Sequence, residues 1–251
     1  MDSQQVRWRV TNPVFVVPDL TEDALTWELG GAEGRHAARS MRLRAGEPLD
    51  LVNGFGLRVS GVVQSVVGDV IIVDVVRVIQ EKAATPQVTL VQALAKGARD
   101  EMAVEICTEL GVDRIIPWQA DRSIVRWDSQ RSKKGADKWR TVAFAAAKQA
   151  RRATIPTVEP MVTSKGLTTQ IAACKDVFIC HEDASASIEN ASFGPNVMVI
   201  VGPEGGISDQ EMEAFKDAGG KPISLGRNVL RASTAGAVAV ARLNFLTGRD
   251  H

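Results

Sequence analysis

Short apolar stretches separated by glycine, proline and asparagine fill the chain up to about residue 80. Several are rich in β-branched side chains and alternate in part between apolar and polar positions, which is typical of β-strands. The expected strands cover residues 14–17, 48–52, 57–66 and 70–79, with one helix around residues 34–43. Closely spaced strands joined by glycine turns predict a small β-barrel or β-rich domain over residues 1–80.

The pattern changes beyond residues 81–87 (EKAATPQ), a polar stretch without periodicity that is interpreted as a linker. Strands are expected at residues 88–95, 114–117, 176–180, 197–201 and 222–225, and helices at 100–110, 136–151, 164–174, 209–218 and 234–247. Strands that alternate with helices of this length predict a parallel sheet with helices on both faces. Residues 88–251 are therefore expected to form an α/β domain.

The composition is that of a soluble globular protein. Hydrophobic residues make up 45% of the chain and charged residues 24%, and no apolar run approaches the about 20 residues that cross a bilayer. Residues 1–5 lack the basic and apolar segments of a signal peptide. The scattered cysteines Cys107, Cys174 and Cys180 favour buried reduced thiols over a zinc site. We therefore expect a cytoplasmic protein without a metal.

Charge is segregated along a chain whose formal net charge is zero. Residues 35–44 carry four arginines, a histidine and no acid, and residues 122–152 carry ten lysines or arginines against two aspartates. Such a basic face suits the phosphates of RNA, and a solvated charged surface is the alternative. The spacing of Gln149 and Arg152 predicts one shared helical face. The candidate RNA contacts are Arg35, His36, Arg39, Arg42, Arg122, Arg126, Gln149 and Arg152.

A glycine-rich loop follows the strand expected at residues 197–201. Ser208 then begins a helix with Glu211 three residues later, a capping-box pattern. A tight turn of glycines lets a ligand approach the backbone closely, although a stiff turn without a ligand is the alternative. The loop has neither the P-loop nor the GxGxxG pattern, which argues against a nucleoside triphosphate or NAD. The residues assigned to a ligand are Val201, Gly202, Pro203, Glu204, Gly205 and Gly206.

A second unusual loop joins the strand expected at residues 222–225 to the last helix. Val229 and Leu230 are apolar residues flanked by arginines, and they suit the wall of a pocket for a flat uncharged group such as adenine. Parallel α/β domains bind ligands beyond the carboxyl ends of their strands, where both loops are expected. We therefore expect one shared pocket, to which the second loop contributes Leu225, Gly226, Val229, Leu230, Arg231, Thr234 and Ala235.

The two loops together, VIVGPEGGIS and LGRNVLRASTAG, resemble the cofactor loops of the RsmE-type 16S ribosomal RNA uracil-N3 methyltransferases, a family of the SPOUT superfamily. The resemblance extends over nearly the whole chain. It departs at Asn228, where the family commonly has arginine, and at Ser233, where it often has glutamate. Ser233 is still suited to cap the following helix. The other similar segments are LVQALAKG, ELGVDRIIP, DRSIV, AAAKQARRATIP, RWRV and RHAARSMRLRAGEPLDLVNGFG.

The resemblance implies a SPOUT α/β methyltransferase domain with a C-terminal trefoil knot, preceded by a PUA-like RNA-binding β-barrel. It also implies S-adenosylmethionine as the cofactor, 16S ribosomal RNA or the small ribosomal subunit as the substrate, and a homodimer. Neither the periodicity nor the spacing of the sequence shows a knot, and knots are very rare in proteins, so the knot is expected from the resemblance alone.

Two residues, Arg231 and Glu204, are assigned to chemistry at the uridine N3, an imide nitrogen whose proton must leave. A guanidinium beside the base carbonyls would stabilise the developing anion, and Arg231 is assigned this role, with a salt bridge that holds the loop as the alternative. Glu204 is a candidate base, but a glutamate in a tight turn more often accepts hydrogen bonds from backbone amides. His181 either borders the methionine end of the cofactor or caps a strand.

Three rival functions remain at the level of sequence. Another SPOUT specificity, such as ribose 2′-O methylation, would use the same loops. A non-catalytic RNA-binding or ribosome-assembly factor would keep the fold without needing the methyl donor. A small-molecule α/β enzyme would explain the glycine loop and leave the arginine-rich segments without a purpose.

Overall fold

The computed structural model describes residues 12–249, apart from the side chains at 129, 130 and 190. The segment RWRV and residues 1–5 lie outside the described residues. The chain divides into two compact units. The first comprises Met1–Lys82 and Ala147–Thr154, and the second comprises Ala83–Ala146 and Ile155–His251.

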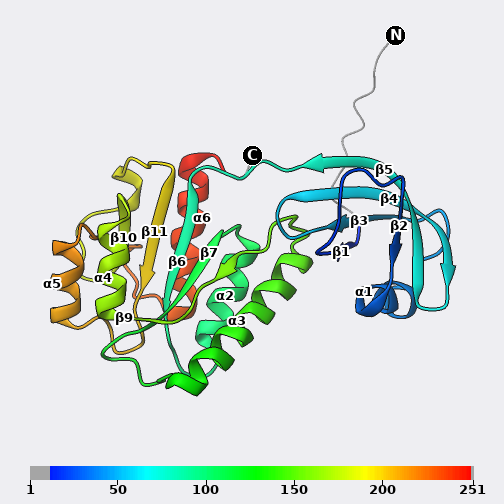
Figure 1. The fold of residues 1–251 in the computed structure, drawn as a ribbon. Helices are drawn as coiled ribbons and strands as arrows, with labels where there is room; N and C mark the ends of the chain where they lie inside the picture. Colours follow the sequence, from blue (N-terminus) through cyan, green and yellow to red (C-terminus); the bar gives the residue numbers. More distant parts are fainter. Residues whose placement is uncertain (1–11, 250–251) are drawn as a thin grey trace, which may run out of the picture. The chain divides into compact units, whose positions relative to one another are not determined.

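The first unit is built on a five-stranded sheet in the order β1-β3-β4-β5-β2, shown in blue and cyan in Figure 1. Only β1 and β3 run parallel, and the other neighbours are antiparallel. The expected helix is present as a short α-helix that continues into a π-helical turn. The elements are β1 (Val14–Val16), β2 (Thr26–Leu29), α1 (Gly31–Arg35), η1 (His36–Ser40), β3 (Pro48–Val52), β4 (Leu57–Val67) and β5 (Val70–Gln80).

Apolar side chains from the strands of this sheet form the core of this unit. Phe15, Leu49, Leu51 and Ile71 are fully buried, as strands with one apolar face require. At Gly61 an added Cβ would lie 2.4 Å from Val73 Cγ1, and the register of β4 against β5 shifts at this residue. Such a bulge increases the local twist of the ladder.

The segment Ala147–Thr154 belongs to the first unit, although the sequence placed it in the second domain. Lys148 forms a 2.6 Å ion pair with Glu33 and lies 5.4 Å from the centre of the Phe15 ring. These contacts join residues more than 100 positions apart in sequence, which a local pattern does not contain.

The second unit is an α/β domain whose sheet is wholly parallel, as predicted. The sheet has seven strands, two more than the sequence predicted. The strand order is β12-β10-β11-β6-β7-β8, with β9 also beside β7. Its elements are β6 (Gln87–Ala93), α2 (Arg99–Glu109), β7 (Arg114–Gln119), α3 (Ser129–Gln149), β8 (Thr157–Val158), β9 (Val162–Thr163), α4 (Ser164–Ala172), β10 (Asp176–Cys180), η2 (Ile188–Asn190), β11 (Asn196–Val201), α5 (Asp209–Asp217), β12 (Lys221–Ile223) and α6 (Ala232–Thr247).

Helices cover both faces of this sheet (Figure 1). Leu167 and Ile171 of α4 and Phe215 of α5 pack on one face of the central strands. The apolar side chains of α2, α3 and α6 pack on the other face. Both faces of the sheet are therefore buried. A ligand can reach the sheet where its strands begin, at the amino edge, or where they end, at the carboxyl edge.

No helix within the described residues is long and apolar enough to span a membrane. The same part of the chain holds no cluster of histidine, cysteine, aspartate and glutamate that could bind a metal ion. Cys107, Cys174 and Cys180 are free cysteines.

Candidate functional site

The loops that follow β10 and β11 and the loop that follows β12 meet around one cavity of about 270 Å³ at the carboxyl edge of the sheet. A smaller hollow of about 50 Å³ adjoins it, and the residues that line both are Cys180, His181, Glu182, Val229, Leu230 and Ala235. The two loops that the sequence singled out are therefore neighbours in space, as predicted. The cavity is lined by Arg99, Cys180, His181, Glu182, Val201, Gly202, Pro203, Glu204, Gly206, Ile207, Val229, Leu230, Arg231, Ala232 and Ala235.

The glycine loop takes a compact shape that larger residues could not adopt. A Cβ added at Gly202 would lie 2.8 Å from Ile207 Cγ1, and one added at Gly205 would lie 3.1 Å from the backbone oxygen of Arg122. Gly206 has a φ of +74° and donates its N–H to the carbonyl of Pro203 at 2.9 Å. These glycines bring the backbone close to the cavity, which is how a glycine loop cradles a ligand.

Glu211 fixes the far end of the glycine loop. The predicted capping box is present: Ser208 Oγ accepts from the Glu211 N–H, and a Glu211 carboxylate oxygen accepts from the Ser208 N–H at 2.9 Å. Glu211 is only 3% exposed and also accepts hydrogen bonds from the Asp121 N–H and the Ser164 hydroxyl. This carboxylate therefore connects three segments of the chain beneath the loop.

The second loop presents apolar side chains to the cavity. Val229 is 74% exposed and Leu230 is half-buried, and both line the cavity together with the buried Ala235. Exposed apolar side chains in a concave site are typical of a wall that a ligand covers. Leu225 and Gly226 line the adjoining hollow.

The prediction for Ser233 is wrong. Helix α6 begins at Ala232 with Arg231 as its N-cap and without a side-chain cap, and Ser233 is a buried residue of its first turn. The Arg231 carbonyl accepts from the N–H groups of Thr234 and Ala235 at 2.8 and 2.9 Å, so the hydrogen bonds at this helix start come from the backbone. Thr234 itself is exposed and lies outside the two hollows, although it was assigned to the cofactor.

A third loop, which the sequence reasoning missed, completes the cavity. Arg99 begins α2, and its guanidinium donates to the Glu204 carboxylate at 3.1 Å. The same Glu204 oxygen accepts from the Lys96 N–H at 3.1 Å. Between Lys96 and Arg99, Gly97 and Ala98 have φ values of +63° and +58°. Ala98 is not a glycine, so its backbone is under local strain in this left-handed conformation. The signal available in the sequence was that this loop, too, follows the carboxyl end of a strand.

Cys180 and His181 form the base of the cavity at the end of β10. Burial raises the pKa of the Cys180 thiol to about 12, so this side chain is a neutral thiol although part of the residue still faces the cavity. The Nδ1 of His181 accepts a hydrogen bond from the backbone N–H of Asp183, and the backbone N–H of His181 donates to the Ile223 carbonyl at 3.0 Å. The histidine therefore both ends the strand and lines the cavity.

The candidate RNA contacts do not form one cluster. Arg35 and Arg39 lie on the helical segment of the first unit and both contact Asp69, Arg39 at 2.5 Å. The hydrogen bond from Arg39 holds the pKa of the Asp69 carboxyl below its usual value. Both arginines are about 70% exposed, at 68% and 70%, so they remain accessible to a phosphate. His36 lies in the same segment and Arg42 lies two residues after its end, and both are exposed.

The remaining candidates divide between the two units. Arg122 packs over the glycine loop and donates to the Ile207 carbonyl at 3.3 Å, and Arg126 donates to the Asp121 carbonyl. Gln149 and Arg152 belong to the first unit. The prediction that these two share a helical face is wrong, because α3 ends at Gln149 and the chain then turns with a φ of +56° at Arg151.

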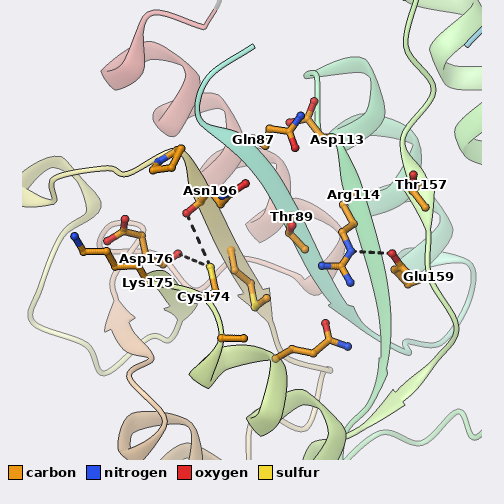
Figure 2. Close-up of a pocket in the computed structure, with 14 residues that line it drawn as sticks. Gln87, Thr89, Asp113, Arg114, Thr157, Glu159, Cys174, Lys175, Asp176 and Asn196 are labelled. Atoms are coloured by element: carbon orange, nitrogen blue, oxygen red, sulfur yellow. Dashed lines mark hydrogen bonds and ion pairs between the residues drawn. The ribbon is translucent and has the colours of Figure 1, made fainter. Parts of the chain in front are cut away.

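A larger cavity, of about 840 Å³, lies at the opposite edge of the same sheet (Figure 2). Gln87, Arg114, Asp176 and Asn196, the first residues of four strands, line it. Its rim is polar, with Arg114 paired to Glu159 at 2.9 Å. No residue of the glycine loop or of the second loop lines it, and we therefore place the candidate site in the smaller cavity, where these two loops meet.

Comparison with known proteins gives a consistent result. Residues 81–244 match the family model described as an RNA methyltransferase domain. The ribosomal RNA small subunit methyltransferase E of Mycobacterium bovis is 39% identical over 242 residues, covering 94% of this chain and 92% of that protein. The protein of the same name from Bacillus subtilis is 28% identical over 90% of this chain and 92% of its own length. A Legionella pneumophila methyltransferase solved with bound SAM is 28% identical, with a TM-score of 0.81 over 93% of this chain and 97% of that one.

Proposed function

Because this chain belongs to the RNA methyltransferase family, we propose that it methylates N3 of a uridine in 16S ribosomal RNA, with S-adenosylmethionine as the methyl donor. One observation carries the proposal: two loops far apart in sequence, after β11 and after β12, form the walls of one cavity. The name of the M. bovis relative supports small-subunit ribosomal RNA as the substrate, and the SAM-bound L. pneumophila structure supports the donor. We assign the activity to the cytoplasm, where ribosomal RNA is found.

The cavity suits the chemistry of the donor. With its adjoining hollow it lies at the lower end of the roughly 300–1,000 Å³ of small-ligand pockets, and Val201, Leu230 and Ala235 offer an apolar surface to an adenine ring. Charged side chains of both signs, among them Glu182 and Arg231, line the remaining wall. A ligand with an adenine, a carboxylate and positive groups would find a partner for each part. When bound, S-adenosylmethionine supplies an activated methyl group.

The protein's own residues would then have two tasks. The first is alignment, in which the rigid glycine loop and the Val229–Leu230 wall hold the reacting groups in line. The second is stabilisation of charge on the uracil ring as its N3 proton leaves. Arg231, at the N-cap of α6 and on the cavity wall, is the proposed donor to the base carbonyl oxygens.

Glu204 is not assigned the role of base, because its carboxylate already binds the Lys96 amide and the Arg99 guanidinium. We expect Glu204→Gln to retain turnover within about tenfold and to leave the shape of the pH–rate profile unchanged, since loss of a general base typically costs about 10²–10⁴-fold. Steady-state methylation rates over a range of pH would measure this. Disappearance of the acidic limb of the profile in the variant would identify Glu204 as the base.

The direct test of the proposed function is analysis of the product. In vitro transcribed 16S ribosomal RNA and isolated small subunits would be incubated with the protein and the donor, and their nucleosides separated by mass spectrometry. We expect 3-methyluridine in at least one of the two substrates. A 2′-O-methylated nucleoside would instead identify another SPOUT specificity, and no binding of the donor in calorimetry would favour a non-catalytic RNA-binding factor.

Three further features of the family are part of this proposal. We propose that the first unit is a PUA-like barrel, that the C-terminal region of the second is a trefoil knot, and that the protein is a homodimer. The return of the chain from the edge strand β12 to pack α6 against β6 and β11 is consistent with a knot. The apolar Phe245 and Leu246 of α6, exposed by 82% and 37%, are consistent with a covered face. Light scattering that gave the mass of a single chain would contradict the dimer.

The arginines beside Asp69 are proposed to bind RNA phosphates. We expect the double variant Arg35→Gln/Arg39→Gln to weaken RNA binding. The negative slope of log K against log salt should become less steep by about two, roughly one for each lost phosphate contact. Its matched control is Asp69→Asn, which keeps both cations and removes their acidic partner, and it should bind RNA at least as tightly as the parent. Equal affinities and slopes for all three proteins in filter-binding titrations would exclude this surface from the RNA site.

A further inference from the structure

An aromatic ring of the first unit projects into solvent outside the residues that the proposed function uses. Phe55 is 81% exposed and lies in the turn of residues 53–56, between β3 and β4. Single exposed apolar residues are common on protein surfaces and carry no meaning alone. Two further observations, on the backbone around Phe55 and on its neighbours, distinguish this residue.

The backbone on both sides of Phe55 is held by several hydrogen bonds. Asn53 Oδ1 accepts from the Phe55 N–H at 2.7 Å and from the Leu57 N–H at 3.1 Å, while Gln80 donates to the Phe55 carbonyl. Gly56 donates to the Ala153 carbonyl at 3.0 Å. A Cβ added at Gly56 would lie 2.7 Å from the Gln80 amide nitrogen. The turn is therefore tightly built around a ring that contributes nothing to the core.

The neighbours of Phe55 come from the segment that carries Arg152. Both Gly54 and Phe55 form bridge pairs with Thr154, and the Arg152 guanidinium donates to the Thr154 hydroxyl at 3.2 Å. The Glu81 carboxylate of the same unit is paired with Arg58 at 2.6 Å. Thr154 thus links the turn that carries the Phe55 ring to the guanidinium of Arg152.

We propose that Phe55 is a stacking platform for one unpaired nucleobase of the RNA substrate, with Arg152 beside it for the adjoining phosphate or for the base plane. Proteins recognise single-stranded RNA in this way, by aromatic faces for bases and cations for the backbone. The preformed turn removes much of the entropic cost of ordering the ring on binding. The inference rests on the proposed function, since it requires RNA as the substrate.

The test compares three full-length variants in binding to the same 16S ribosomal RNA transcript. We expect Phe55→Ala to weaken binding by about tenfold or more, the loss that follows removal of one aromatic–base stack, and Phe55→Trp to bind at least as tightly as the parent. The slope of log K against log salt should stay unchanged in Phe55→Ala, because phenylalanine carries no charge. The matched control is Leu25→Ala, which removes an equally exposed apolar residue (85%) from the same unit.

Ultraviolet cross-linking followed by mass spectrometry gives an independent readout, and a nucleotide attached to the peptide that contains Phe55 is expected. Equal RNA affinities for the parent, Phe55→Ala and Leu25→Ala would overturn the proposal while leaving the proposed methyltransferase function intact. A loss seen only with the assembled subunit, and not with naked RNA, would also overturn it and indicate a contact with ribosomal protein. If the parent protein bound neither the donor nor RNA, the proposed function and this inference would fall together.

Discussion

Replacing Arg231 by alanine is expected to lower kcat for RNA methylation by about 10²–10³-fold, because removal of one preorganised donor that stabilises developing charge typically costs this much. The Kd for S-adenosylmethionine should stay within about threefold of the parent value. Arg231 lines the cavity from the N-cap of α6, and within residues 12–249 its guanidinium makes no ion pair. Its carbonyl, which every variant retains, is the group that holds the first turn of the helix. The side chain is therefore available for the substrate, and its removal should not unfold the loop.

The control for Arg231 lies four residues earlier in the same loop. Arg227 is also exposed but lies outside both hollows, so Arg227→Ala should keep full turnover. Arg231→Lys should recover only part of kcat, because an ammonium lacks the planar fork that can bind a carbonyl edge with two hydrogen bonds. Calorimetry for the donor and single-turnover methylation would separate the two effects. Normal turnover with weakened donor binding in Arg231→Ala would show that this arginine supports the loop and has no part in catalysis.

The sequence predicted the second unit almost element by element, for identifiable reasons. Strands β10 and β11 are continuous apolar runs, because a parallel sheet with helices on both faces buries both sides of its strands. Helix α5 carries its start signal in Ser208 and Glu211. Where these signals were absent, the prediction failed. The two-residue strands β8 and β9 are too short to show any periodicity. The first turns of α3 are polar, and the prediction therefore missed them: the helix begins seven residues before the expected position 136.

The candidate site was predicted in the parts that are local in sequence. Both loops were found because glycines and apolar side chains are unusual immediately after a strand, and the spatial prediction followed from the parallel topology. Arg99 was missed because its place in the cavity depends on an ion pair with Glu204, 105 residues away. The assignment of residues 147–154 to the first unit was missed for the same reason, since the partners of this segment include Glu33 and Arg58.

Loss of the Arg58 side chain should destabilise the first unit. Its side chain is 10% exposed and binds Asp50, itself 6% exposed, at 2.9 Å, together with Glu81 and the carbonyl of Arg151. Arg58→Met would leave the Asp50 carboxylate buried beside an apolar group, and breaking a buried ion pair in this way costs about 3–5 kcal/mol of unfolding free energy. Because two units can unfold in separate transitions, the loss is best measured by hydrogen exchange of the β3 and β4 amides in the full chain.

A matched control separates burial from pairing as the cause. Arg35 pairs with Asp69 on the surface of the same unit, with its side chain 68% exposed, and Arg35→Met should cost less than about 1 kcal/mol. Similar losses in the two variants would contradict the burial argument. Arg58→Met also removes the donor to Arg151, next to the proposed RNA contact Arg152. RNA binding should therefore fall with the stability of the first unit, while the affinity for S-adenosylmethionine, whose proposed pocket lies wholly in the second unit, stays unchanged.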